Sequence, residues 1–352
     1  MSPSSRASAS VEGAPSQASA AAPSWVHYAW PVRIAGDADA VEAATRQWVV
    51  DRGLALASHA RARFDRVQVG LLVACTYPDV SHADRRLAAD FLAWVFLQDD
   101  RLDEARDGHD AGAVADVFRG YLDVVGGRPA RPGEPNNVRV LDELATRLRA
   151  RASDVWMDRF RESLRGFWLD GVVVETAYRQ RGVVPTRAEY LAQRVHSIGV
   201  LQVLDLAELF RGTPLPPEIR HDESHEALRD AAARIIACAN DLYSYDKERR
   251  AGDPNNLVTV LVQHEGMTLE QALDEVVRVH DEEVVVLESL AAGALRRFPQ
   301  HHVAVAGWIE DVRAWIVGAL EWTERAARYA SGRELLGETR RRSSRPAGRA
   351  SR

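Results

Sequence analysis

Apolar residues recur with helical spacing along most of the chain, and runs of alternating β-branched residues do not recur. Ala, Leu, Arg and Glu dominate, and these residues favour helices. Even the Val-rich stretch 282–287 lies inside a helical period. The pattern therefore predicts an all-α protein. Its expected helices lie near 38–50, 52–64, 66–76, 82–100, 111–126, 136–150, 153–180, 187–211, 224–249, 254–264, 268–294 and 299–330.

The breaks between these helices are short and rich in Gly and Pro, and no linker interrupts residues 28–335. A chain of 352 residues with 46% hydrophobic residues can bury one large core. We therefore expect one domain, 27–335, built as a bundle of about a dozen helices. Residues 1–26 are expected to be disordered because 19 of the first 24 are Ala, Ser, Pro or Gly. Residues 336–352 are expected to form a disordered Arg-rich tail.

Composition and charge exclude several classes of function. The net charge of −6 offers no basic surface for nucleic acid. No run of 18 apolar residues predicts a membrane-spanning helix, and the N-terminus lacks the apolar core of a signal peptide. The two cysteines, Cys75 and Cys238, lie in apolar helical segments and are expected to be buried free thiols. These features favour a cytoplasmic protein that binds neither nucleic acid nor a membrane.

An acidic cluster closes the predicted helix 82–100. Asp99 and Asp103 are four residues apart, as are Asp100 and Glu104, so each pair lies on one helix face. Four carboxylates at the end of an apolar helix repel one another unless cations lie among them. Mg²⁺ suits such oxygen ligands, particularly together with substrate phosphates. A solvated helix end remains the alternative explanation of this cluster by itself.

A second polar stripe lies on the predicted helix 224–249. Asn240, Ser244 and Glu248 step by four residues twice, which places an amide, a hydroxyl and a carboxylate on one face. These groups together make a cation site of low charge. The neighbouring Lys247 can meet a phosphate oxygen. An amphipathic helix with these residue types on its polar face is the alternative.

Taken together, the two clusters carry a resemblance to a known family. The strings Asp99-Asp100-Arg101-Leu102-Asp103 and Asn240-Asp241-Leu242-Tyr243-Ser244-Tyr245-Asp246-Lys247-Glu248 resemble the two metal-binding motifs of the bacterial class I terpene synthases. Arg194 lies 46 residues before Asn240, and the pair Arg328-Tyr329 follows near the C-terminus, where that family places an arginine and an Arg-Tyr pair. The resemblance covers about residues 28–330.

The resemblance implies a fold, a site and a reaction. It implies a helical bundle around a central active-site cavity and three Mg²⁺ ions with bound diphosphate. The implied metal ligands are Asp99, Asp103, Asn240, Ser244 and Glu248. The implied diphosphate-binding residues are Arg194, Lys247, Arg328 and Tyr329. Asp99 and Arg194 are thus expected in the catalytic site, with Phe96 one turn below Asp99 as the best-placed aromatic stabiliser of a carbocation.

A helix break at 197–199 is also implied by the resemblance, and Gly199 is compatible with it. Six further aromatic residues are candidates for the cavity wall, although core packing explains each of them as well. They are Phe91, Trp94, Trp168, Tyr243, Trp308 and Trp315.

The implied function is cyclisation of a linear prenyl diphosphate, a small-molecule substrate, by a monomer or homodimer. Farnesyl diphosphate (C15) is the expected substrate. Small residues such as Ile198 and Val203 could widen the pocket towards geranylgeranyl diphosphate (C20). An isoprenyl chain-elongating synthase would carry a second aspartate-rich motif instead of Asn240, Ser244 and Glu248.

Two other classes remain as alternatives. A metal-dependent phosphohydrolase would use adjacent His-Asp pairs, but the three pairs of this chain fall at predicted turns or charged faces. These pairs are His109-Asp110, His221-Asp222 and His280-Asp281. A helical scaffold protein would not need inward-facing acidic stripes on two helices.

Overall fold

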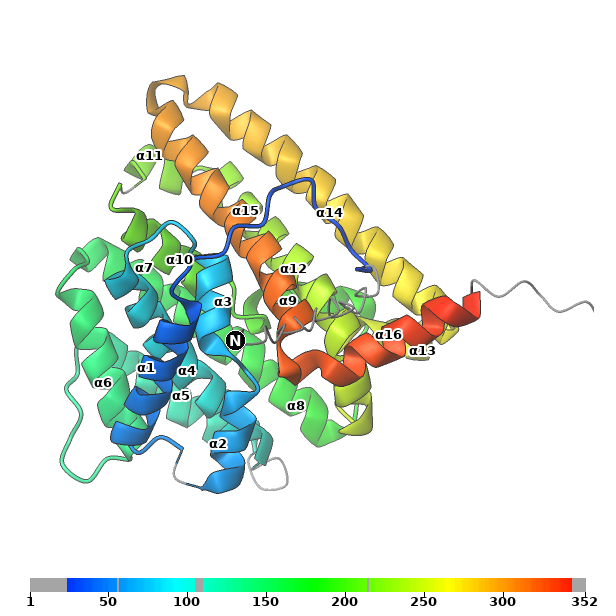
Figure 1. Ribbon diagram of the computed structural model, residues 1–352, viewed down its shortest axis with the longest axis horizontal. Helices are drawn as coiled ribbons and strands as arrows, with labels where there is room; N and C mark the ends of the chain where they lie inside the picture. Colours follow the sequence, from blue (N-terminus) through cyan, green and yellow to red (C-terminus); the bar gives the residue numbers. More distant parts are fainter. Residues whose placement is uncertain (1–23, 56, 105–109, 214, 344–352) are drawn as a thin grey trace, which may run out of the picture.

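The computed structural model describes residues 24–55, 57–104, 110–213 and 215–343, and over these residues it contains helices and no strand. This confirms the all-α prediction (Figure 1). The α-helices are α1 (Ala38–Asp51), α2 (Ser58–Asp65), α3 (Val69–Thr76), α4 (His82–Glu104), α5 (Ala111–Val125), α6 (Asn136–Arg149), α7 (Asp154–Arg165), α8 (Val173–Arg181), α9 (Arg187–Ser197), α10 (Leu201–Arg211), α11 (Pro217–Arg220), α12 (Glu223–Arg250), α13 (Leu257–His264), α14 (Leu269–Arg297), α15 (His302–Arg325) and α16 (Ala330–Ser343). A π-helix, η1 (Gly166–Val172), joins α7 to α8, and two single 3₁₀ turns, η2 (Pro299–His301) and η3 (Ala327–Tyr329), flank α15.

The helix boundaries differ from the sequence prediction at a few places. The predicted helix 187–211 is two helices, α9 and α10, and the chain between them turns at Gly199, whose φ is +73°. The break expected at 197–199 is therefore present. The last predicted helix, 299–330, ends at Arg325, and α16 begins a new helix at Ala330. The four-residue helix α11 was not predicted.

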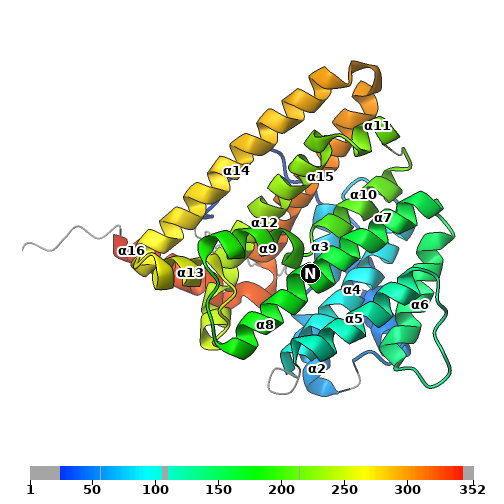
Figure 2. The same cartoon turned by 180° about the vertical axis from the view of Figure 1, so that it is seen from behind.

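Helix α12 is the centre of the bundle. It packs against α9, α13, α14, α15 and α16, and Figures 1 and 2 show it enclosed from both sides. Leu228, Ile235 and Leu242 on this helix have no exposed surface. Helix α15 also packs against α3, which packs in turn against α1 and α4. Helices α4 and α12, which are far apart in sequence, are thus linked through α3 and α15.

The π-helix η1 lies close to the C-terminal end of α9. A Cβ atom on Gly171 would lie 2.7 Å from the backbone nitrogen of Ser197, so only glycine fits this approach. A π-helix carries one extra residue per turn and occurs often at functional sites. Here it lies beside the break between α9 and α10.

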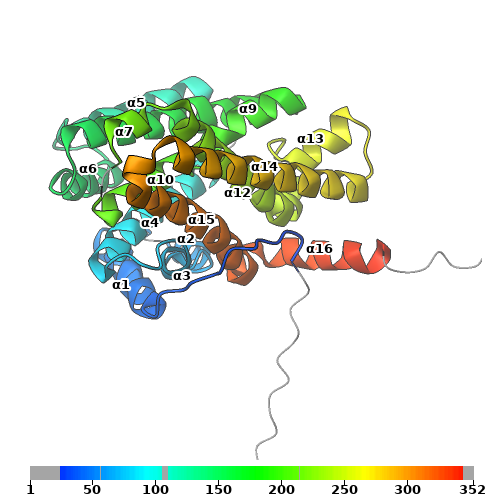
Figure 3. The same ribbon diagram turned by 90° about the horizontal axis from the view of Figure 1, so that it is seen from above.

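The two ends of the described chain meet on one side of the bundle. Residues 24–36 run from α16 along α15 towards α1, as Figure 3 shows. The guanidinium of Arg340 on α16 lies over the ring of Trp25. Helix α16 packs on α12, buries Leu336 to 2% exposure and continues to Ser343.

Residues 336–343, which the sequence analysis assigned to a disordered tail, are part of α16 in the structure. Arginine is a good helix former, so an Arg-rich stretch that also buries Leu336 can stay helical. Val26, also assigned to a disordered segment, is buried. The rest of both predicted segments, 1–23 and 344–352, lies outside the described residues.

Two further predictions from the composition concern the cysteines and membrane-spanning helices. Cys75 and Cys238 are buried free thiols, as predicted. No helix in the described ranges is both long enough and apolar enough to cross a bilayer.

Candidate active site

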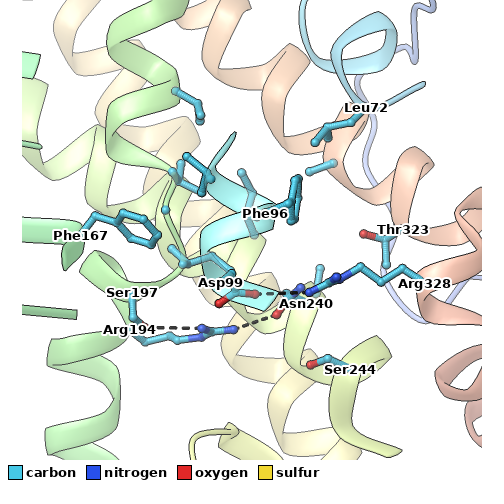
Figure 4. Close-up of a pocket in the computed structure, with 18 of the residues that line it drawn as sticks. Leu72, Phe96, Asp99, Phe167, Arg194, Ser197, Asn240, Ser244, Thr323 and Arg328 are labelled. Carbon is cyan, nitrogen blue, oxygen red and sulfur yellow. Dashed lines mark hydrogen bonds and ion pairs between the residues drawn. The ribbon is translucent and has the colours of Figure 1, made fainter. Parts of the chain in front are cut away.

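A cavity of about 230 Å³ opens between α4, α12 and α15. We call its polar part the polar end; the close-up in Figure 4 shows Asp99, Arg194, Asn240, Ser244 and Arg328 grouped there, with Leu72 at a distance. The rest of the lining is the apolar wall, which comes from six helices and from the break between α9 and α10. Its members include Leu72, Leu92, Phe96, Phe167, Val203, Ile236, Trp315, Ile316, Leu320 and Trp322.

Asn240, Ser244 and Glu248 all line the polar end, as their spacing predicts. The hydroxyl oxygen of Ser244 is buried and has no hydrogen-bond partner among the described residues. Burial raises the pKa of Glu248 to about 7, helped by the negative charges of Asp241 and Asp253. A buried carboxylate close to other negative charges is stabilised by a bound cation.

Asn256 holds the Glu248 carboxylate in place from the next helix. Its side-chain Nδ2 donates to Glu248 Oε2 over 2.8 Å and to the carbonyl of Asp241 over 3.0 Å. Asn256 is also the N-cap of α13, with Oδ1 accepting from the backbone N–H of Val258. One asparagine therefore fixes α13 and orients a predicted metal ligand.

Asp99 reaches the same cavity from α4. Its side chain is half exposed, and Arg328 Nη2 lies 3.4 Å from its Oδ2. Arg328 Nη1 also lies 3.6 Å from Oδ1 of the buried Asp100. Asp103 lies in the last turn of α4, but its side chain is outside the described part of the structure. Its role as a ligand stays a prediction.

Arg194 is buried in the polar end and pairs with residues of α12 and α8. Its Nη2 donates to Asn240 Oδ1 over 2.8 Å and to Asp241 Oδ1 over 2.9 Å. Its Nη1 lies 3.5 Å from Glu175 Oε1. Burial lowers the pKa of Arg194, but Tyr190, Asp241 and Glu175 raise it more, so the net pKa is well above its usual value. The guanidinium is therefore a fixed positive charge inside the protein.

The remaining predicted anion-binding residues also reach the cavity. Lys247 is exposed at its edge. The Tyr329 hydroxyl accepts a hydrogen bond of 3.0 Å from Asn240 Nδ2. The Arg328 guanidinium lies 5.4 Å from the centre of the Phe96 ring, which links the polar end to the apolar wall. Every predicted metal-binding or diphosphate-binding residue with a described side chain thus lines one cavity.

Sequence reasoning missed four polar residues of the polar end. Glu175 and Arg179 come from α8, and Asp253 and Asn255 from the loop after α12. Arg179 Nη1 lies 3.2 Å from Asp253 Oδ2 and 3.7 Å from Glu175 Oε2. The spacing of Glu175 and Arg179, four residues apart on a helix, was the available signal. It was indistinguishable from an ordinary surface ion pair.

The aromatic predictions were mixed. Phe96 and Trp315 line the cavity, but five other candidates do not. These five are Phe91, Trp94, Trp168, Tyr243 and Trp308. They have core partners: the Trp94 indole, for example, donates to the Asn137 carbonyl over 2.9 Å, and Trp308 stacks on His225. Phe167 and Trp322 line the cavity and were not predicted.

The donors of the polar end suit a hard divalent cation. Among described residues, no three His, Cys, Asp or Glu side chains gather as a metal-binding cluster. Asn240 and Ser244 are neutral oxygen donors beside the carboxylate of Glu248, and the unpartnered Ser244 hydroxyl leaves one of them available. Mg²⁺ prefers this mixture of few carboxylates, other oxygens and phosphate groups. The residues therefore fit Mg²⁺ bound together with a phosphate-bearing ligand.

Known proteins are similar to this chain in sequence and in fold. Residues 90–285 match the family model described as terpene synthase family 2, C-terminal metal binding. The chain is 32% identical over 303 residues to (+)-T-muurolol synthase ((2E,6E)-farnesyl diphosphate cyclizing) of Roseiflexus castenholzii, covering 86% of this chain and 92% of that protein. It is 29% identical to germacrene A synthase of Nostoc punctiforme, covering 83% and 90%.

The fold is also similar to that of a solved structure. The crystal structure of linalool/nerolidol synthase from Streptomyces clavuligerus is similar to this chain with a TM-score of 0.75 and 26% identity. The similarity covers 83% of this chain and 98% of that one. The family match spans more than half of the chain, including the ends of α4 and α12 that carry the polar end.

Proposed function

Because the chain belongs to the terpene synthase family, whose members are lyases, we propose that it is a Mg²⁺-dependent cyclase of a linear prenyl diphosphate. The reaction would break the bond between the allylic carbon and the diphosphate oxygen, then close one or more rings in the resulting carbocation. The observation that carries this proposal is the composition of the cavity. Fixed cations and oxygen donors occupy one end of it, and an aromatic-rich apolar wall continues directly from them.

We assign three Mg²⁺ ions to Asp99, Asp103, Asn240, Ser244 and Glu248. Bound there, Mg²⁺ would neutralise the negative charge that develops on the departing diphosphate. The raised pKa of Glu248 and the unpartnered hydroxyl of Ser244 support this assignment, because a bound cation would relieve both.

Four residues would hold the diphosphate itself: Arg194, Lys247, Arg328 and Tyr329. Arg194 and Arg328 offer planar guanidinium groups that can bind phosphate oxygens through two hydrogen bonds each. Arg194 is held by Asn240 and Asp241, so its position is set before the substrate arrives. Donors oriented in advance stabilise developing charge without a reorganisation cost.

The apolar wall would fold the carbocation and keep bulk water away from it. The ring face of Phe96 lies next to the polar end, where positive charge first appears on the substrate. Aromatic faces stabilise cations without reacting as nucleophiles. Exclusion of bulk water prevents premature capture of the cation. The released diphosphate would accept the proton in a final deprotonation.

Farnesyl diphosphate is our proposed substrate. The relative in R. castenholzii is named for cyclisation of (2E,6E)-farnesyl diphosphate, which supports a C15 substrate here. Geranylgeranyl diphosphate is the second candidate, because Ile198 and Val203 do line the cavity and both are smaller than an aromatic residue. We further propose a cytoplasmic enzyme that acts as a monomer or homodimer.

Incubation with C10, C15 and C20 prenyl diphosphates tests the proposal. With Mg²⁺, we expect diphosphate release and a volatile cyclic terpene from farnesyl diphosphate, and no release after EDTA treatment. Diphosphate release should be measured by a coupled phosphate assay and the organic product by mass spectrometry. No turnover of any of the three substrates would refute the cyclase function.

A further inference from the structure

Gln202 is a buried polar residue in the wall of the cavity. It is the second residue of α10, lies among apolar neighbours in the lining and is 2% exposed. Its side-chain oxygen Oε1 has no hydrogen-bond partner among the described residues. A buried amide without a partner is destabilising, and such groups in native proteins commonly bind an ordered water or a ligand.

The break between α9 and α10 places the Gln202 amide beside backbone carbonyls that accept no helix hydrogen bond. A Cβ on Gly199 would lie 3.1 Å from Gln202 Nε2 and 3.3 Å from Cε2 of Phe167, so the amide and the ring flank the glycine closely. Between α9 and α10 no described backbone N–H donates to the carbonyls of Ile198 and Gly199. Both of these residues line the cavity.

A single bound water molecule would satisfy the unpartnered Gln202 oxygen. A buried water needs two to four polar partners. The Gln202 amide, the Ser197 hydroxyl and the unpaired carbonyls of Ile198 and Gly199 all belong to lining residues and would be its partners. Ser197 also lines the cavity, and its Oγ lies 3.5 Å from Nη1 of Arg194. These partners lie within the short segment 197–202, in a wall whose other members are mostly apolar.

We propose that Gln202 positions a water molecule that captures the last carbocation, so that the main product is a terpene alcohol. This inference rests on the proposed cyclase function and specifies its product class. Gln202 would then be a positioning residue that determines the product through the water it holds.

The step balances without any further reagent. A lone pair of the water oxygen forms a C–O bond with the cationic carbon, which gives a protonated alcohol. The protonated alcohol then loses one proton to the diphosphate released earlier, and the products are a neutral alcohol and hydrogen diphosphate. The Gln202 amide orients the water and is too weak a base to keep the proton itself.

Gln193 offers a matched comparison within the same protein. It is also a buried glutamine, 7% exposed, and neither Oε1 nor Nε2 of its amide has a hydrogen-bond partner among the described residues. It lies on α9, and it is not part of the cavity lining. Gln193→Met therefore controls for the loss of a buried amide as such.

The test is turnover of farnesyl diphosphate with Mg²⁺ in H₂¹⁸O, with diphosphate release and the organic products measured separately. For the wild type we expect an alcohol carrying ¹⁸O. For Gln202→Met we expect the alcohol fraction to fall about tenfold in favour of hydrocarbons, with diphosphate release within about threefold of wild type. Gln202→Asn keeps an amide on a shorter side chain and should retain part of the alcohol, whereas Gln193→Met should keep the wild-type product ratio.

The outcomes separate the two proposals. Diphosphate release by the wild type with only hydrocarbon products, or an alcohol without ¹⁸O, would overturn the role of Gln202 and leave the cyclase function standing. An unchanged alcohol fraction in Gln202→Met would overturn it as well, and so would an equal loss of alcohol in Gln193→Met. Absence of diphosphate release by the wild type would instead overturn the cyclase function and, with it, this inference.

Discussion

The polar end and the apolar wall of the cavity differ in how the chain builds them. The polar end is concentrated: three of its oxygen donors stand on one face of α12, and hydrogen bonds fix its central cation, Arg194, to that helix. The wall is dispersed, with Leu72, Phe167 and Trp315 coming from α3, η1 and α15. The polar end therefore depends on the identity of a few residues. The shape of the apolar wall depends on many residues together.

This difference assigns separate tasks to the two regions. We expect the polar end to set the rate of diphosphate release and the apolar wall to set the identity of the product. Substitutions that alter one of these readouts and spare the other would sharpen the distinction, and substitutions that alter both equally would break it.

Glu248→Gln should have the largest effect on rate. The change keeps the size of the side chain and the hydrogen bond from Asn256 but removes the negative charge offered to Mg²⁺. Diphosphate release should fall about 10²- to 10³-fold, the range seen when a preorganised stabilising group is lost. The control is Glu288→Gln, which removes a carboxylate that pairs with Arg313 at the surface and should keep the wild-type rate.

Arg328→Lys should have a smaller effect on rate. Lysine keeps the charge but loses the planar fork that can bind two phosphate oxygens, so we expect a fall of about 10- to 100-fold in kcat/KM. The matched control is Arg325→Lys, three residues earlier, where an exposed arginine pairs with Glu321 over 3.2 Å. Equal effects of the two changes would argue against a special role for Arg328.

Phe96→Leu should change the product more than the rate. Loss of one aromatic face next to a cation corresponds to about 0.5–2 kcal/mol, or about 2- to 30-fold in rate. The product pattern in the mass spectrum should shift as well. Phe91→Leu is the control on the same helix, because Phe91 packs on Phe160 and is not part of the cavity lining. It should lower stability and keep the product pattern; an altered pattern would contradict our division of the aromatic residues.

The last expected effect concerns the stability of the metal-free protein and not its catalysis. The pKa of Glu248 is about 7 in the folded chain against an ordinary 4.5, so the folded state keeps its proton after the unfolded state has lost it. Stability is then lost as the pH rises from about 4.5 to about 7. In EDTA, Glu248→Gln should be more stable than wild type at pH 8, by about 1–3 kcal/mol, and nearly equal at pH 5. Urea denaturation at the two pH values checks this, and a gap that is the same at both would contradict it.

Sequence patterns predicted the polar end far better than the wall. Asn240, Ser244 and Glu248 could be read from spacing because one regular helix converts a step of four residues into a common face. Arg179 and Asp253 could not, since their pairing depends on how α8 meets the loop after α12. Phe167 was missed for a related reason: its position depends on a π-helix, and helical periodicity in the sequence does not distinguish a π-turn from an α-turn.

The same distinction between local pattern and long-range contact applies to the helices. Helices with continuous apolar periodicity, such as α4 and α14, were predicted within a few residues. The tail beyond residue 335 was not, because its helical order comes from contact with α12 and burial of Leu336. The amino-acid composition of the tail itself does not indicate its contact with α12.

Calorimetric binding of inorganic diphosphate tests the central claim most directly, because it examines the polar end without any contribution from the apolar wall. Our account predicts saturable binding to the wild type in the presence of Mg²⁺, little binding in EDTA, and loss of the Mg²⁺-dependent binding in Glu248→Gln. Diphosphate binding that is equally tight with and without Mg²⁺, or unaffected by Glu248→Gln, would contradict a site in which α4, α12 and the arginines act together on one metal-bound diphosphate.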